Sequence, residues 1–130
     1  MTHETPVRIY YEDTDMGGVV YYANYLKFIE RGRSELVELL GLNQREMRDR
    51  DGIVFVVTRV VADYLAPARL DDRLVVHTSH RAASPVRWVF DQEVRRGEQV
   101  LFRAEVTAVC MTLDGRPTRL PAALRGGGSA

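Results

Sequence analysis

The chain has 130 residues, of which 45% are hydrophobic and 28% are charged. This size and composition predict a single globular domain at residues 1–125, followed by a disordered or vector-derived tail at residues 126–130. The formal net charge of zero argues against nucleic acid as the main partner, because domains that bind nucleic acid usually carry a basic excess. No stretch approaches the roughly 18 apolar residues of a membrane span, and the N-terminus has no secretory pattern. We therefore expect no membrane span and a cytoplasmic location.

The first half of the chain predicts a short strand at residues 8–11 and then a long amphipathic helix. From Tyr22 to Leu40 apolar side chains recur at helical spacing, with charged side chains elsewhere. Gly32 falls on this apolar stripe, where a sheet could approach closely, and Gly41 is placed to end the helix. A short second helix is expected after Asn43, which can cap it.

The second half reads as sheet. Alternating and Val-rich segments predict strands at 53–65, 73–81, 86–94 and 99–112, with a hairpin turn at Gly97. One long central helix wrapped by a curved antiparallel meander of about five strands satisfies this order, and the fold class is α+β. The sheet's other face needs a cover or must tolerate water, so we expect a homo-oligomer in which a second subunit covers it.

The segment between the first strand and the helix carries the groups suited to chemistry. Asp13 and Asp15 precede Gly17 and Gly18, close to the expected helix start. The first N–H groups of a helix have no partner within it, and they stabilise negative charge. Glycine lets a ligand approach the backbone, which makes Gly18 a candidate substrate contact.

Such a loop could hydrolyse a thioester. An unpaired N–H near Tyr22 would polarise a carbonyl group, and the Asp15 carboxylate could attack that carbonyl or activate water. The apolar side chain of Val19 would help to keep the site dry. A thiolate leaves without a strong general acid, since its parent thiol has a pKa of about 8.5, so a site without histidine suffices.

Two other interpretations fit parts of the loop sequence. Asp13, Asp15 and Gly18 match the first, third and sixth positions of a calcium loop, but its twelfth position is Asn24 rather than glutamate, which argues against calcium. A purely structural role, in which either aspartate caps the turn or the helix, is as well supported by composition as catalysis.

The remaining reactive side chains are weaker candidates. The three histidines have no acidic or cysteine neighbours at ligand spacing, so we expect no metal site. Cys110 is the only cysteine and lies in a strand pattern, which makes it a poor nucleophile. Trp88 and Phe90 read as core residues.

Residues 7–35 resemble the 4-hydroxybenzoyl-CoA thioesterase family of hotdog proteins, in particular its Tol-Pal-associated acyl-CoA thioesterase branch. The resemblance is carried by Tyr10-Tyr-Glu-Asp-Thr-Asp-Met-Gly-Gly-Val-Val-Tyr21 and by a second segment, Asp63-Tyr-Leu-Ala-Pro-Ala-Arg-Leu-Asp-Asp72. It implies a hotdog fold, hydrolysis of acyl-CoA without metal or cofactor, and assembly into dimers or tetramers.

The resemblance also implies roles for two residues. Asp15 takes the position of the catalytic aspartate, as nucleophile or general base, and the backbone N–H of Tyr22 that of the donor to the thioester carbonyl. The Tol-Pal-associated branch usually has histidine where this chain has Tyr22, so the acyl group stays open between short aliphatic and aromatic. We expect arginines at a subunit edge to hold the CoA phosphates, and strand position suggests Arg59, Arg81 and Arg87.

Two alternatives to hydrolysis remain. A hotdog hydratase acting on enoyl or hydroxyacyl thioesters would need an acid/base histidine near the carboxylate, and none lies in or beside the loop. A non-catalytic acyl-CoA binding module could keep the same carboxylate.

Overall fold

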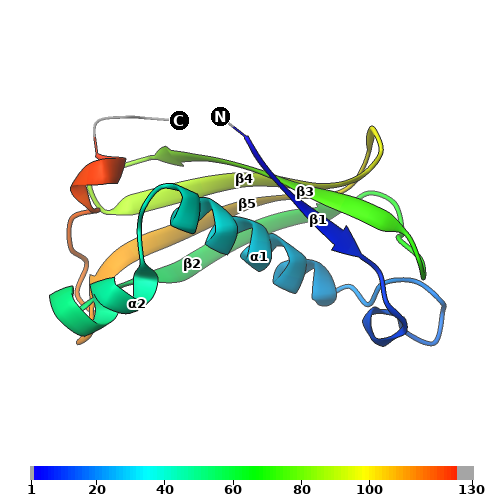
Figure 1. The fold of residues 1–130 in the computed structure, drawn as a ribbon, viewed down its shortest axis with the longest axis horizontal. Helices are drawn as coiled ribbons and strands as arrows, with labels where there is room; N and C mark the ends of the chain where they lie inside the picture. The colour runs from blue at the N-terminus through cyan, green and yellow to red at the C-terminus, as the bar shows by residue number, and fades with distance from the viewer. Residues whose placement is uncertain (1, 126–130) are drawn as a thin grey trace.

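The structure is a computed structural model that describes residues 2–125, and the predicted tail at 126–130 lies outside this range. One helix lies along one face of a five-stranded antiparallel sheet (Figure 1). The strands are β1 (His3–Arg8), β2 (Ile53–Tyr64), β3 (Arg73–Ala82), β4 (Arg87–Arg96) and β5 (Gln99–Thr112). The helices are α1 (Asn24–Leu39) and α2 (Gln44–Glu46), and α2 continues as a π-helical turn over Met47–Asp51. Short 3-10 turns lie at Tyr11–Asp13 and Ala122–Leu124.

The strand order is β1-β3-β4-β5-β2, which only partly matches the predicted meander. β3, β4 and β5 follow one another as antiparallel neighbours, and Gly97 in the last turn has a φ of 60°. The expectation that β2 pairs with β3 is wrong, because β2 pairs with β5 along the opposite edge. The connection from β2 to β3 therefore crosses the end of the sheet, and it passes beside the loop between β1 and α1.

Helix α1 has 16 residues and starts two residues later than predicted, because Tyr22 and Ala23 form a turn ahead of it. Its buried face packs on the sheet, and Gly32 is the point of closest approach. A Cβ built there would lie 2.7 Å from the Thr78 hydroxyl and 2.9 Å from a methyl of Val76, which confirms the predicted close contact. Gly41, with a φ of 81°, follows the end of the helix as expected.

The first strand lies upstream of its predicted place. β1 ends at Arg8, and Tyr11, the last residue of the predicted strand, is 82% exposed. Ile9 is still held, because its N–H donates to the carbonyl of Asp72. The chain then turns away into the 3-10 turn, whose capping contacts outweigh the alternating pattern.

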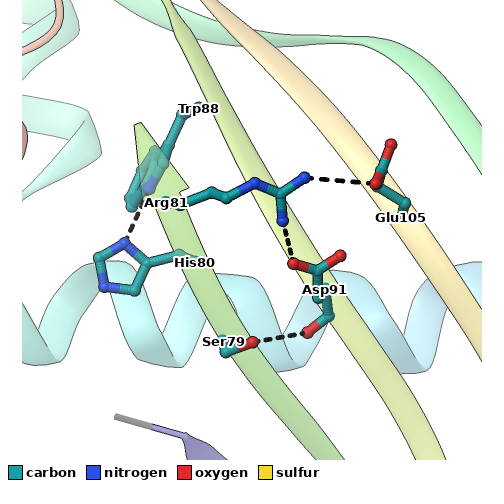
Figure 2. Close-up of polar contacts among 6 residues, drawn as sticks. All are labelled: Ser79, His80, Arg81, Trp88, Asp91 and Glu105. Atoms are coloured by element: carbon teal, nitrogen blue, oxygen red, sulfur yellow. Dashed lines mark hydrogen bonds and ion pairs between the residues drawn. The ribbon is translucent and has the colours of Figure 1, made fainter. Parts of the chain in front are cut away.

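The sheet face opposite α1 carries paired charges beside two buried valines, Val89 and Val109. The Arg81 guanidinium contacts the carboxylates of Asp91 and Glu105, as Figure 2 shows, and Glu93 contacts Arg95 and Arg103. Such a face tolerates water, so it does not need a second subunit to cover it.

Exposed apolar side chains lie along the β2 edge instead. They are Val56, Val57, Val60, Val61 and Tyr64, each between 38% and 48% exposed. Among residues 2–125 no helix is long and apolar enough to cross a membrane.

Candidate active site

The loop between β1 and α1 is a tight hairpin. Thr14 and Val20 form an antiparallel bridge, and the N–H of Asp15 donates to the carbonyl of Val19 at 2.9 Å. The turn closes at Gly18, whose N–H donates to the Asp15 carbonyl and whose φ of 78° favours glycine. The loop therefore has a defined conformation set by its own backbone bonds.

Asp13 and Asp15 have different surroundings within this loop. The Asp13 carboxylate accepts the Tyr10 N–H at 2.8 Å, and its backbone carbonyl accepts the N–H of Tyr21 and the side-chain amide of Asn24. Asp13 thus holds the loop together through three contacts, while its carboxylate, like that of Asp15, accepts one hydrogen bond and leaves one oxygen without a partner among residues 2–125. Asp15 is exposed, and its Oδ1 accepts the Gly17 N–H at 2.8 Å, whereas Oδ2 accepts no hydrogen bond from residues 2–125. Its carboxylate is oriented by one bond and keeps an oxygen free for chemistry.

The backbone before α1 offers donors close in sequence to Asp15. Within the described chain the N–H groups of Tyr22 and Ala23 donate to no protein acceptor. The carbonyl of Tyr22 accepts the hydroxyl of Tyr64 at 2.9 Å, and Tyr64 comes from the end of β2. Burial, and then the neighbouring Tyr22, raise the pKa of Tyr64, so this hydroxyl stays protonated and donates.

The connection from β2 to β3 is hydrogen-bonded to the loop. Val20 donates its N–H to the Ala68 carbonyl at 2.8 Å, and Val19 forms a bridge with Arg69. The two sequence segments that carried the family resemblance are therefore in contact. The sequence alone did not show that they meet, because that contact depends on β2 lying at the far edge of the sheet.

Asp72 fixes this connection to the sheet. Its carboxylate accepts the Arg69 N–H at 2.8 Å and pairs with Arg96 at 2.7 Å. Burial opposes ionisation of Asp72, but the Arg69 N–H and the Arg96 guanidinium outweigh it, so the pKa of this carboxyl is lowered. No pattern in the sequence indicated this role of Asp72.

A groove runs along α1 beside β2. It consists of two cavities of about 550 and 230 Å³ that share the lining residues Glu30, Arg33 and Val57. The rest of its wall is mainly apolar and includes Leu26, Ile29, Phe55, Val60, Trp88 and Phe90. It starts within the first turn of α1, close to the loop, and has room for an acyl group.

The three arginines proposed for CoA do not surround this loop. In the strand register Arg59 lies opposite Thr107, Arg81 opposite Val89 and Arg87 opposite Val109. All three therefore lie on the charged face of the sheet, and Arg81 is already paired. Arg69 lies nearer to the loop, and its guanidinium has no carboxylate within 4.0 Å among residues 2–125. Its place in the second resemblance segment was the only signal that could have pointed to it.

The other candidate nucleophiles and bases lie in the core. Cys110 is fully buried, and burial raises the pKa of its thiol, which disfavours the thiolate. His80 is buried and accepts the indole N–H of Trp88 at 2.9 Å through Nδ1 (Figure 2). Trp88 and Phe90 are core residues, as predicted.

Comparisons with known proteins identify the family. Residues 9–127 match the family model described as the thioesterase-like superfamily. The chain is 39% identical over 117 residues to the acyl-CoA thioesterase YbgC of Haemophilus influenzae, covering 89% of this chain and 86% of that one.

Solved structures of thioesterases share the fold. A probable thioesterase from Bartonella henselae superposes with a TM-score of 0.88 at 35% identity, covering 93% of this chain and all of the other. A 1,4-dihydroxy-2-naphthoyl-CoA thioesterase from Synechocystis superposes with a TM-score of 0.88 at 27% identity, covering 95% and 92%. These matches confirm the expected hotdog architecture, and the chain belongs to the thioesterase-like superfamily.

Proposed function

We propose that this protein hydrolyses the thioester of acyl-CoA to a free acid and CoA, with Asp15 as the catalytic carboxylate and the Tyr22 N–H as the donor to the thioester oxygen. The observation that carries the assignment of the site is the pairing, in one short segment, of a carboxylate that has a free oxygen with N–H groups that have no protein acceptor. Asp13, two residues away, joins Tyr10 and Asn24 and is proposed as the structural support of the loop.

Each part of the site has a chemical task. Negative charge develops on the thioester oxygen as the carbonyl carbon is attacked, and N–H groups ahead of a helix stabilise that charge. Asp15 either attacks the carbon or takes a proton from the attacking water. Gly18 and Val19 shape the loop without bulky polar groups. The CoA thiolate leaves without an acid, which suits a loop that has no histidine.

The acyl group is proposed to lie in the groove between α1 and β2. Its mainly apolar wall fits a short aliphatic or an aromatic acyl group. The relative from Haemophilus influenzae bears the name acyl-CoA thioesterase, and the one from Synechocystis acts on an aromatic acyl-CoA. The two segments that carry the family resemblance support placing this chain in the Tol-Pal-associated branch. The cytoplasm is proposed as its location.

Arginines are proposed to hold the CoA phosphates. Arg59 and Arg87 have no carboxylate within 4.0 Å among residues 2–125, so they are better placed to accept phosphate than Arg81. A phosphate at Arg81 would have to compete with Asp91 and Glu105. Arg69 is a further candidate within the same subunit, because it lies beside Val19 of the loop.

A homo-oligomer is part of the proposal, and its interface is placed at the β2 edge. An exposed, long and apolar edge strand invites pairing with another chain. Here the apolar side chains lie on both faces of β2, so a second copy could pair with the strand and also pack against it. Sedimentation velocity of the unaltered protein distinguishes a dimer from a tetramer.

Release of free thiol from a panel of aliphatic and aromatic acyl-CoAs tests the assignment. Asp15→Asn keeps the size of the side chain and its acceptor for the Gly17 N–H, but removes the charge. We expect turnover to fall at least about 100-fold with the fold and oligomeric state unchanged. Asp49→Asn, the same change on an exposed turn, is the control and is expected to leave turnover as it is.

Three results would contradict the proposal. Near-normal turnover by folded Asp15→Asn would remove Asp15 from the chemistry. Binding of acyl-CoA without thiol release would favour a binding module, and hydration of an enoyl-CoA would favour the hydratase.

A further inference from the structure

The two peptide units that precede α1 are each held at the carbonyl. The peptide between Tyr21 and Tyr22 has its carbonyl bonded to the N–H of Asn24 at 2.9 Å. The peptide between Tyr22 and Ala23 has its carbonyl bonded to the hydroxyl of Tyr64 at 2.9 Å. Among residues 2–125 Tyr64 is the only donor to the Tyr22 carbonyl, so the second peptide is fixed by a side chain rather than by the backbone.

Holding a carbonyl also sets the direction of the N–H in the same peptide. In a trans peptide the C=O and N–H bonds point to opposite sides of the unit, and the described chain has no cis peptide. The bond from Tyr64 therefore directs the N–H of Ala23 away from Tyr64. This N–H, like that of Tyr22, has no protein acceptor. Two successive unpaired donors thus precede the helix.

The Tyr64 ring is itself held in place. It lies 4.9 Å from the ring of Phe102, 5.6 Å from Tyr25 and 6.1 Å from Tyr22, measured between ring centroids. Phe102 is fully buried and Tyr25 is 3% exposed, so two of these neighbours belong to the core. The hydroxyl is therefore presented to the Tyr22 carbonyl by a side chain with little freedom to turn away.

We propose that Tyr64 is a positioning residue for thioester hydrolysis: its hydroxyl orients the Tyr22–Ala23 peptide, so that the Ala23 N–H acts as a second donor to the thioester oxygen beside the Tyr22 N–H. This inference rests on the proposed function of the loop. Tyr64 contacts neither the substrate nor the reacting atoms in this role, and it transfers no proton.

Tyr64→Phe tests the inference because it removes one hydroxyl and leaves the ring in its aromatic contacts. We expect kcat to fall about tenfold, as for the loss of one hydrogen bond, with KM within about twofold of the original value. The pH profile of kcat should keep its shape, since the hydroxyl moves no proton. Tyr21→Phe is the matched control: its ring lies 5.0 Å from that of Tyr22, its hydroxyl has no partner among residues 2–125, and kcat should stay unchanged.

A second measurement follows the Ala23 amide directly. On binding of an acyl-CoA analogue in which a methylene group replaces the sulfur, the Ala23 amide proton should shift downfield in NMR spectra, and the shift should be smaller in Tyr64→Phe. Any of four results would overturn the inference. Three concern Tyr64→Phe: an unchanged kcat, a rise in KM alone, or an altered pH profile. The fourth is an Ala23 amide proton whose chemical shift does not change when the analogue binds.

Asp15→Asn in the same assay separates the two claims. If Asp15→Asn loses turnover and Tyr64→Phe does not, the proposed function stands and the role of Tyr64 falls. If Asp15→Asn retains turnover, the proposed site falls, and the role of Tyr64 falls with it.

Discussion

His80 shows how a single buried side chain couples the stability of this fold to pH. It is 5% exposed, Nδ1 accepts the Trp88 N–H, and Nε2 has no partner among residues 2–125. Burial lowers the pKa of His80, because the charged form would lose its water. The native state therefore holds the neutral ring at pH values where the unfolded chain, with a pKa of about 6.5, already binds a proton.

The free energy of unfolding should consequently depend on pH. The contribution of the neutral His80 ring to the free energy of unfolding has its full value above about pH 6.5. It decreases as the pH falls from there towards the pKa of His80 in the folded protein, by at most about 1.4 kcal/mol per pH unit. Urea unfolding at pH 7.5 and pH 5.5 measures this loss. His80→Asn keeps an acceptor near Nδ1 but does not titrate, so its stability should change less between the two pH values. Equal changes in both proteins would contradict the assignment.

At the scale of the element, the packing of α1 on the sheet depends on the close approach of Gly32. Alanine is normally favoured over glycine within a helix by about 1 kcal/mol. Here the added Cβ would lie 2.7 Å from the Thr78 hydroxyl and 3.3 Å from the Gln92 amide, and overpacking costs about 1–3 kcal/mol. We expect Gly32→Ala to lower the free energy of unfolding by about 1 kcal/mol in denaturant titrations. Glu38→Ala on the exposed side of α1 is the control and should change the free energy of unfolding by less than about 0.5 kcal/mol. A higher free energy of unfolding for Gly32→Ala would show that the side chains of the sheet move aside at little cost.

The elements also show which features the sequence could predict. Local signals were sufficient for the second-half strands, for the Gly97 turn and for the close contact at Gly32, because each depends on periodicity or on one residue type. The pairing of β2 with β5 was missed, since neighbours in sequence are the default expectation for strands. The support of the Tyr22 carbonyl by Tyr64 was missed for the same reason, because it joins two segments 42 residues apart.

For the site, the sequence identified the loop but left the roles of its two aspartates open. The contacts of Asp13 with Tyr10 and Asn24 distinguish it from Asp15, and neither contact is visible in a spacing pattern. Strand position alone suggested the three arginines, and it says nothing about their charged partners. Arg81, paired with two carboxylates, illustrates that limit.

At the scale of the whole molecule, the distribution of apolar surface favours assembly through one edge. The charged face opposite α1 satisfies its own groups, whereas β2 leaves Val57 and Val60 about half exposed beside the α1 groove, at 45% and 42%. A second copy at this edge would remove apolar surface from water and would close the side of the groove proposed for the acyl group. Assembly and activity should therefore be lost together.

Val60→Glu tests this coupling. A carboxylate in the interface would lose its water without gaining a partner, so we expect the protein to sediment as a smaller species and to lose acyl-CoA hydrolysis in parallel. Leu39→Glu, which adds the same charge at another exposed apolar side chain, should change neither. Sedimentation velocity at several concentrations, run beside the thiol-release assay, measures both. An unchanged assembly in Val60→Glu would place the interface elsewhere. A smaller species with full activity would show that each subunit carries a complete site, with the groove closed by its own side chains.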